Sequence, residues 1–366
     1  MKTDPLATKA PNKEFLTVQV LRFVAALAVV GVHSTFYTSE RLAPDFPVFH
    51  QGFHGVRLFF VISGFVMILS SQQLETRAKG WLIFAIRRIL RIVPLYWLIL
   101  TIKVVVLLGT SGLALHSRFD LPVVLKSFLF IPALNPDGEI KPLHGVGWTL
   151  NFEMFFYLLF TLALLLRIPV VRSLAVVLLA CAALSPLRTA DWPVPLQFYC
   201  DPMVLDFLAG MVIARWVQHG LTLPHAVSWG LIIAGLLGLF LPISTGEQPT
   251  LGLSMLMTLF SAMTIIGAIA LEPAVRTRLP RWAVFMGAAS YSLYLVHPLI
   301  APAAPVILMK LRLAFPLPAV VASMIISLIG GALLYLVAEK PVSRYLTGRL
   351  KASSLMRPST RPAPAA

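Results

Sequence analysis

Two ionisable residues, Arg22 and His33, stand within one apolar run of membrane-spanning length. The run is QVLRFVAALAVVGVHSTFY, residues 19–37, and a spacing of eleven residues places both side chains on one helical face about 16 Å apart. Ionisable groups inside a membrane span are costly and often mark a pathway, a proton relay or a site. The alternative is that Arg22 reaches the lipid headgroups and His33 only hydrogen-bonds a neighbouring helix.

An arginine cluster, Arg87, Arg88 and Arg91, falls within one helical turn of WLIFAIRRILRIVPLYWL, residues 81–98. The spacing places Arg87 and Arg91 on one face, and Pro94 should bend the helix or start its deeper part. Positive residues also mark the cytoplasmic ends of spans, but lysine would meet that need equally well. The planar fork of arginine suits phosphate, so the cluster predicts a site for a cytosolic phosphorylated ligand.

A single carboxylate, Glu153, lies about one turn inside the apolar segment GVGWTLNFEMFFYLLF, residues 145–160. A carboxylate at that depth needs a partner, a proton or water. It should lie near the outer side of the membrane at a depth similar to that of His33, so the two meet if their helices pack together. Further intramembrane polar residues, each expected to be structural when taken alone, are Asp201, Asp206 and His297.

Several other kinds of site are not supported by any spacing in the chain. The first outer loop holds Glu40, His50 and His54 without a metal-binding pattern, so we predict no metal site. Cys181 and Cys200 cannot build a disulfide framework or a thiolate cluster. No nucleophile elbow or phosphate-binding glycine loop is present. The remaining groups suit transfer from a cytosolic phosphorylated donor to an outside acceptor, or a proton-coupled transporter.

The composition predicts that helices in a membrane position these residues. Of 366 residues, 58% are hydrophobic and only 12% are charged, and the mean hydropathy is +0.84. Soluble domains carry about 25% charged residues, so we predict an all-α integral membrane protein. The net charge of +15 could suit nucleic acid, but its placement in the chain indicates membrane topology instead.

Apolar runs of spanning length predict a bundle of about ten transmembrane helices. The predicted spans are residues 16–37, 56–71, 90–109, 149–166, 171–187, 202–217, 228–244, 252–271, 289–309 and 318–338. They lie in one transmembrane domain, residues 16–346, between an N-terminal segment, 1–15, and a tail, 347–366, which we predict to be disordered. The longest outer loop, about 110–147, is either functional or a cap over short spans.

In this ten-span arrangement, most lysines and arginines lie in loops and end segments on the same side of the membrane as the N-terminus. Because cytoplasmic loops carry an excess of both residues, we predict that both termini are cytoplasmic. Arg22 and the arginine cluster then lie toward the cytoplasm, and His33 lies toward the outside.

The chain resembles the membrane-bound acyltransferase-3 family, most closely its exopolysaccharide acetyltransferase branch. The resemblance covers about residues 17–346 and is carried, in the family's order, by VQVLRFVAALAVVGVHS, GVRLFFVISGFVM, FAIRRILRIVPLYWL, GVGWTLNFEMFFYLLF, YSLYLVHPLI and VAEKPVSRYL. It implies ten core helices in a bacterial inner membrane. It also implies an O-acetyltransferase that moves an acyl group from cytosolic acetyl-CoA to a hydroxyl of an exported polysaccharide or its lipid-linked precursor.

The resemblance also assigns roles to residues. Arg22 and His33 match the family's essential pair, and Glu153 matches the glutamate of its tryptophan–leucine–glutamate motif. Its cytoplasmic arginine motif corresponds to Arg87, Arg88 and Arg91, which we expect to bind the donor. It implies acyl-CoA as a donor substrate rather than a permanently bound cofactor. The expected partners are acyl-CoA, a carbohydrate acceptor, the lipid bilayer and polysaccharide assembly machinery, with no nucleic acid.

One position departs from the family pattern. Where the second span of the family usually has an acidic residue, this chain has Arg57. If that carboxylate orients the histidine, its role is vacant here or is taken by Glu153 or another carboxylate. His33 would act as general base, or as a nucleophile that carries the acyl group. A peptidoglycan sugar, a lipid or an antibiotic would be an acceptor compatible with the same donor motifs, and a transporter without acyl transfer is the alternative function.

Overall fold

The part of the chain that the computed structural model describes, residues 14–109, 119–241, 250–353 and 355, is helical and contains no strand. Eight helical segments in this part are long and apolar enough to cross a membrane. They are α1 (Leu16–Arg41), η1 (His50–His54) with α2 (Gly55–Ser71), α3 (Gly80–Gly109), η3 (Gly145–Gly147) with α5 (Trp148–Leu165), α6 (Val170–Leu184) with η4 (Ser185–Leu187), α10 (Leu251–Val275), α12 (Ser290–Ile300) with α13 (Ala303–Lys310), and α14 (Pro316–Leu334) with its continuation. The predicted all-α class is confirmed.

The two remaining predicted spans also coincide with helices. They are α8 (Val204–Gln218) and α9 (His225–Phe240), which are 15 and 16 residues long. Shorter helices connect the long ones: η2 (Gln72–Leu74), α4 (Leu121–Phe128), α7 (Val194–Tyr199) and α11 (Arg281–Ala288). Within the described residues, eight spans therefore follow from length and hydropathy, and ten follow only if the two shorter helices also cross.

Helix α3 begins before the apolar run from which we predicted the third span. We predicted a span over residues 90–109, but α3 begins at Gly80 and passes through Pro94 without interruption. The arginine cluster therefore lies inside a continuous helix, with Ile83, Phe84 and Arg88 buried among neighbours. A hydropathy window stops at charged residues, whereas packing of the apolar face extends the helix beyond them.

The C-terminal segment is partly helical, which corrects the predicted tail. After α14 a π-helical turn (Tyr335–Glu339) leads directly into α15 (Lys340–Ala352). Residues 347–352 of the predicted disordered tail are thus in a helix, which carries several basic residues. The rest of that prediction, at 354 and 356–366, and most of the predicted N-terminal segment, at 1–13, lie outside the described residues.

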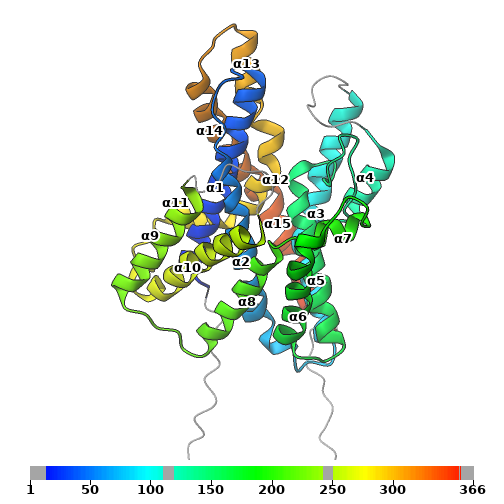
Figure 1. Ribbon diagram of the computed structural model, residues 1–366, viewed down its shortest axis with the longest axis vertical. Helices are drawn as coiled ribbons and strands as arrows, with labels where there is room; N and C mark the ends of the chain where they lie inside the picture. Colours follow the sequence, from blue (N-terminus) through cyan, green and yellow to red (C-terminus); the bar gives the residue numbers. More distant parts are fainter. Residues whose placement is uncertain (1–13, 110–118, 242–249, 354, 356–366) are drawn as a thin grey trace, which may run out of the picture.

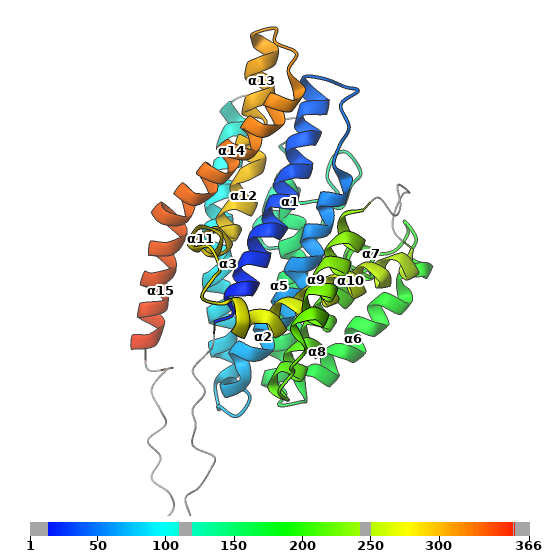
Figure 2. The ribbon, with the colours of Figure 1, turned by 90° about the vertical axis from the view of Figure 1, so that its left-hand side faces the viewer.

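Helices α1 and α2 occupy the middle of the bundle (Figures 1 and 2). In Figure 1, α9 and α10 lie on one flank, and α3, α5 and α6 lie on the other. Helix α1 packs against α2, α11, α12 and α14, and α2 packs closely against α8. A Cβ added to Gly64 would lie 2.1 Å from the Phe207 carbonyl oxygen, and one added to Gly210 would lie 2.0 Å from that of Val61. Glycine at both positions lets the two backbones touch, as small residues do between membrane helices.

Candidate functional site

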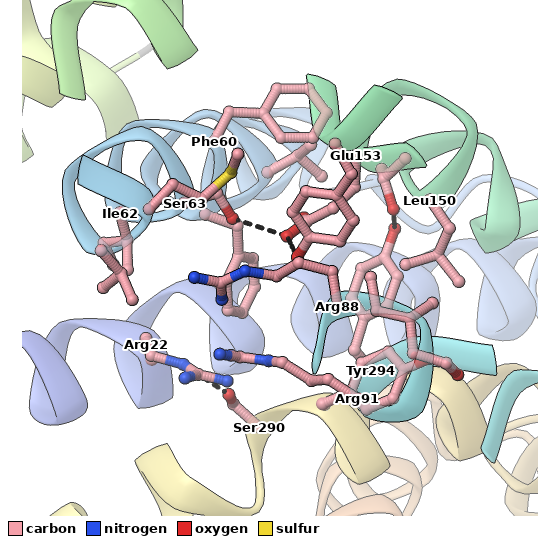
Figure 3. Close-up of a pocket in the computed structure, with 18 residues that line it drawn as sticks. Arg22, Phe60, Ile62, Ser63, Arg88, Arg91, Leu150, Glu153, Ser290 and Tyr294 are labelled. Atoms are coloured by element: carbon pink, nitrogen blue, oxygen red, sulfur yellow. Dashed lines mark hydrogen bonds between the residues drawn. The ribbon is translucent and has the colours of Figure 1, made fainter. Parts of the chain in front are cut away.

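The polar residues of α1, α2, α3, α5 and α12 converge on one pocket with about 760 Å³ of empty space, its open mouth included (Figure 3). We call it the arginine pocket, because three of its lining residues are Arg22, Arg88 and Arg91. The other polar lining residues are Ser63, Thr149, Glu153, Tyr157, Ser290, Tyr291 and Tyr294. The sequence-predicted residues Arg22, Arg88, Arg91 and Glu153 are thus brought together from three helices.

Arg22 and Arg91 point toward the same side of this pocket (Figure 3). The Arg22 Nε donates to the Ser290 hydroxyl on α12 at 3.2 Å. A serine neutralises no charge, and the carboxylates close enough to act on Arg22 are Glu153 and Glu339, so three guanidinium groups face two carboxylates and the pocket keeps an excess of positive charge. This excess favours an anionic ligand, and guanidinium groups suit phosphate or carboxylate oxygens.

Arg88 is held by contacts with two aromatic rings and a serine. Its guanidinium lies over the rings of Phe84 and Tyr157, at 5.2 and 5.7 Å from their centroids, and its Nη2 donates to the Ser70 hydroxyl. Arg87 is exposed and does not line the arginine pocket. The pocket therefore takes the i, i+3 pair Arg88 and Arg91, rather than the i, i+4 pair that the spacing suggested.

Glu153 lies in the arginine pocket with Arg22, and not beside His33 as its expected depth allowed. Its Oε1 accepts hydrogen bonds from the Ser63 hydroxyl, at 3.0 Å, and from the Tyr157 hydroxyl (Figure 3). Helix α5 packs against α2, α3 and α6, which directs this face toward the arginines. The Glu153 carboxylate balances part of the pocket's positive charge, and Glu339, which does not line the pocket, balances another part.

His33 instead meets a second histidine, His297 of α12, in what we call the histidine pair. The His33 Nδ1 is 3.3 Å from the His297 Nε2, and the two ring centroids are 4.9 Å apart. The His33 Nδ1 is also 2.9 Å from the Val29 carbonyl oxygen. A carbonyl oxygen only accepts, so neutral His33 carries its proton on Nδ1 and keeps a lone pair on Nε2. That nitrogen is able to take a proton from a ligand.

One face of α12 connects the two places. Ser290, Tyr294 and His297 follow each other at i, i+4 and i+7, and they therefore share the face that contacts α1. Tyr294 lines the arginine pocket, and its ring lies 5.9 Å from that of His297. Its hydroxyl donates to the Val146 carbonyl at 2.9 Å. From the sequence we predicted that His297, taken by itself, is structural, and we did not single out Ser290 or Tyr294. The spacing of the three residues in the sequence already indicates one helical face.

Arg57, which stands where the family usually has an acidic residue, belongs to a separate group of buried polar side chains. Its Nη1 lies 3.2 Å from the Asp206 Oδ2 on α8, and its Nη2 donates to the Ser254 hydroxyl at 2.7 Å. The Thr258 hydroxyl also donates to Asp206, at 2.6 Å. Both charged side chains are buried, so each supplies the partner that the other needs. Arg57 therefore joins α2 to α8 and α10 and makes no hydrogen bond to His33.

The outer loop before α5 covers the outer part of α12. His144 in this loop is fully buried, and its Nε2 lies 2.9 Å from the Leu295 carbonyl oxygen. Burial, followed by the charge of Lys103, lowers the pKa of His144 to about 3, so this side chain stays neutral. This contact is to α12, whereas the cap was expected over the short second and fourth spans, and residues 110–118 of the loop lie outside the described residues. Among the described residues, no group of three or more His, Cys, Asp or Glu side chains is arranged to hold a metal ion.

Taken together, the site has two levels along α1. The arginine pocket near its N-terminal end can hold an anionic group, and the histidine pair, about 16 Å further along, can accept a proton. Both levels lie between the same two helices, α1 and α12, so an elongated ligand that lies along these helices would span both.

Known proteins that are related to this chain in sequence include named acyltransferases. The family description "Acyltransferase domain" matches residues 15–336. The exopolysaccharide production protein ExoZ of Rhizobium meliloti is 33% identical over 84% of this chain and 94% of its own. The acyltransferase MdmB of Streptomyces mycarofaciens is 25% identical over 94% of this chain and 95% of its own. The peptidoglycan O-acetyltransferase OatA of Listeria monocytogenes is 25% identical over 82% of this chain but only 51% of its own. No solved structure gave a significant match.

Proposed function

Because this chain belongs to the acyltransferase-3 family and is an O-acetyltransferase, we propose that it takes an acetyl group from cytosolic acetyl-CoA and transfers it to a polysaccharide hydroxyl. The acceptor is a surface or exported polysaccharide, or its lipid-linked precursor. The observation that carries this proposal is the polar face of α12, on which Ser290 and Tyr294 line the arginine pocket and His297 contacts His33. ExoZ, named for exopolysaccharide production and matched over most of both chains, supports the acceptor class.

The donor would lie in the arginine pocket. Coenzyme A carries phosphates on a nucleotide and a long pantetheine arm that ends in the thioester. Arg88 and Arg91 would bind the phosphates, with Arg87 adding positive charge at the exposed side of α3. Arg22, on the same helical face as His33 and about three turns before it, would line the path of the arm. Glu153 would accept the hydrogen bond of the Tyr157 hydroxyl. In the absence of the donor, its negative charge would balance part of the positive charge of the arginines.

The transfer itself would take place at His33. Its Nε2 takes the proton of the acceptor hydroxyl while the hydroxyl oxygen attacks the thioester carbonyl. The carbon–sulfur bond then breaks, the new ester remains on the sugar, and the CoA thiolate takes the proton from His33. A base positioned in this way typically contributes about 10²- to 10⁴-fold to the rate.

The membrane arrangement that fits this reaction has ten spans and two cytoplasmic ends. The chain is a multi-pass membrane protein, with eight helices of spanning length in the described part. Counting α8 and α9 as spans gives an even number and agrees with the distribution of lysine and arginine. In a bacterial inner membrane, the arginine pocket then opens toward the cytoplasmic donor, and the histidine pair lies toward the exported acceptor.

A purified-protein assay tests this function. Full-length protein in lipid nanodiscs is mixed with radiolabelled acetyl-CoA and exported polysaccharide, and both acetyl ester and free CoA thiol are measured. We expect His33→Ala to lower transfer at least about 100-fold, because the base is removed. His225→Ala, at an exposed position at the start of α9, is the matched control and should leave transfer unchanged. Transfer by His33→Ala at the wild-type rate would exclude His33 as the base.

The alternative function is a transporter or exporter that performs no acyl transfer. It would share the intramembrane charges but would neither bind CoA nor release its thiol. Comparing O-acetylation of surface polysaccharide, by NMR or mass spectrometry, in cells with and without this protein separates the two. Unchanged acetylation together with altered export of the polysaccharide would favour the transporter.

A further inference from the structure

We propose that His297 is a positioning residue for His33, an inference that rests on the proposed acyl transfer. Its Nε2 accepts the Nδ1 proton of His33 and holds the His33 ring so that the opposite nitrogen faces the acceptor hydroxyl. His297 thereby performs the task that a carboxylate performs in an aspartate–histidine pair.

The direction of the hydrogen bond follows from the acceptors around both rings. The His297 Nδ1 lies 3.1 Å from the Leu293 carbonyl oxygen, as the His33 Nδ1 lies 2.9 Å from that of Val29. Each carbonyl belongs to the residue four positions earlier and can only accept, so each neutral ring carries its proton on Nδ1. The His297 Nε2 therefore offers a lone pair. In the 3.3 Å contact, His33 is the donor and His297 is the acceptor.

His297, the second acceptor, fixes the His33 ring relative to another helix, which the Val29 carbonyl cannot do. Val29 lies on the same helix as His33, so their hydrogen bond fixes the ring only relative to α1. His297 is fully buried on α12, and its own ring is held by Leu293. Its contact therefore ties the His33 ring to a second helix. The ring of Phe53 meets His33 edge-on at 5.7 Å from another direction.

The pair also suits the charge that forms during transfer. When the His33 Nε2 takes the acceptor's proton, the ring becomes positive and its Nδ1 proton becomes a stronger donor. Two acceptors aimed at that proton in advance stabilise the charge inside a poorly solvated site. His297 itself gains no proton, because the proton leaves from the His33 Nε2 to the CoA thiolate.

No described carboxylate competes for this position. The hydrogen bonds recorded for His33 go to Val29 and His297, whereas Glu153 lies in the arginine pocket and Asp206 is paired with Arg57. The orienting role that the departure at Arg57 left open is thus filled by a second histidine.

The test compares two substitutions in full-length protein in nanodiscs. His297→Phe keeps a ring without an acceptor, and His297→Gln keeps a side-chain oxygen that can accept. We expect His297→Phe to lower kcat about 100-fold with an unchanged KM for acetyl-CoA, because the arginine pocket is intact. His297→Gln should recover at least about tenfold of that loss. His225→Phe, at an exposed site, is the control.

Ring-nitrogen NMR of isotope-labelled histidine gives a second readout that needs no turnover. The His33 signals are assigned by their loss in His33→Asn. We expect one His33 state with the proton on Nδ1 in the wild type, and a mixture of both tautomers in His297→Phe. Equal kcat losses in the Phe and Gln variants with an unchanged His33 spectrum would show packing alone and overturn the proposal, as would unchanged kcat in both. A wild-type protein without any transfer would refute the proposed function, while the spectra would still decide the hydrogen bond.

Discussion

The arginines of the RRILR run differ in their surroundings, although the sequence presents them as one cluster. Arg88 is buried against two aromatic rings, Arg91 is exposed but lines the same pocket, and Arg87 is exposed outside it. The same contrast holds for the two histidines of the histidine pair. His297 is fully buried with its proton directed to its own helix, and His33 remains partly accessible. Residue type alone therefore does not determine which group meets a ligand.

Replacing Arg88 with lysine tests the phosphate-binding role while keeping the positive charge. We expect Arg88→Lys to raise the Kd for CoA about tenfold or more, because lysine loses the planar fork and the stacking on Phe84 and Tyr157. The Kd is measured by titration calorimetry in nanodiscs. Arg172→Lys, at an exposed arginine in the first turn of α6, is the matched control. An unchanged Kd for Arg88→Lys would mean that the cluster serves membrane topology only.

Replacing Glu153 with glutamine removes the negative charge from the arginine pocket and keeps the side-chain shape. We expect Glu153→Gln to bind CoA a few-fold more tightly, because the arginines no longer share their attraction with a carboxylate. The amide oxygen can still accept from Tyr157 and Ser63. The same calorimetric titration measures the change. Weaker binding would indicate that the carboxylate contacts the donor directly.

At the scale of helices, glycines determine how closely neighbouring elements approach. The contact of α2 with α8 depends on Gly64 and Gly210, and a Cβ on Gly287 of α11 would lie 1.9 Å from the Gln19 carbonyl oxygen of α1. The paired charges of Arg57 and Asp206 lie between the same helices, α2 and α8. Close backbones and a satisfied buried ion pair together hold α2 in place beside the arginine pocket.

The glycine contact can be tested by adding one methyl group. Gly210→Ala should destabilise the protein by about 1–3 kcal/mol, because a Cβ 2.0 Å from the Val61 carbonyl oxygen forces α2 and α8 apart. Gly230→Ala is the control, since nothing lies within 4 Å of its added Cβ in α9. Thermal unfolding of both variants in detergent is followed by circular dichroism. An equal Tm for the two variants would contradict the proposed close packing.

At the scale of the whole molecule, the proposed reaction requires the arginine pocket and the histidine pair to face opposite sides of the membrane. Helices α1 and α12 lie side by side, with Arg22 against Ser290 and His33 against His297, so they run in the same direction. In Figure 2 the connection after α1 and the α13 segment lie at one end of the bundle, and the end of α15 lies at the other. The predicted orientation places that second end in the cytoplasm.

Cysteine labelling tests this orientation. In a Cys181→Ser/Cys200→Ser background, Asp45→Cys lies in the loop after α1, and Lys79→Cys lies before α3; both positions are exposed. A membrane-impermeant maleimide applied to spheroplasts should label Asp45→Cys, and it should label Lys79→Cys only after permeabilisation. The reverse pattern would place the arginine pocket outside and remove the cytosolic donor from the proposal.

The sequence by itself determined the structural class of the protein and the approximate positions of ten apolar segments. It also singled out Arg22 and His33 of α1 as candidate site residues. These features depend on composition, local periodicity and charge placement, which are properties of short stretches of chain. Only the tertiary structure decided that Arg88 rather than Arg87 enters the pocket and that Glu153 joins Arg22. It also decided that His33 meets His297 and that Arg57 pairs with Asp206. These contacts join residues far apart in the chain, and they depend on the rotation and crossing of packed helices, which no single stretch encodes.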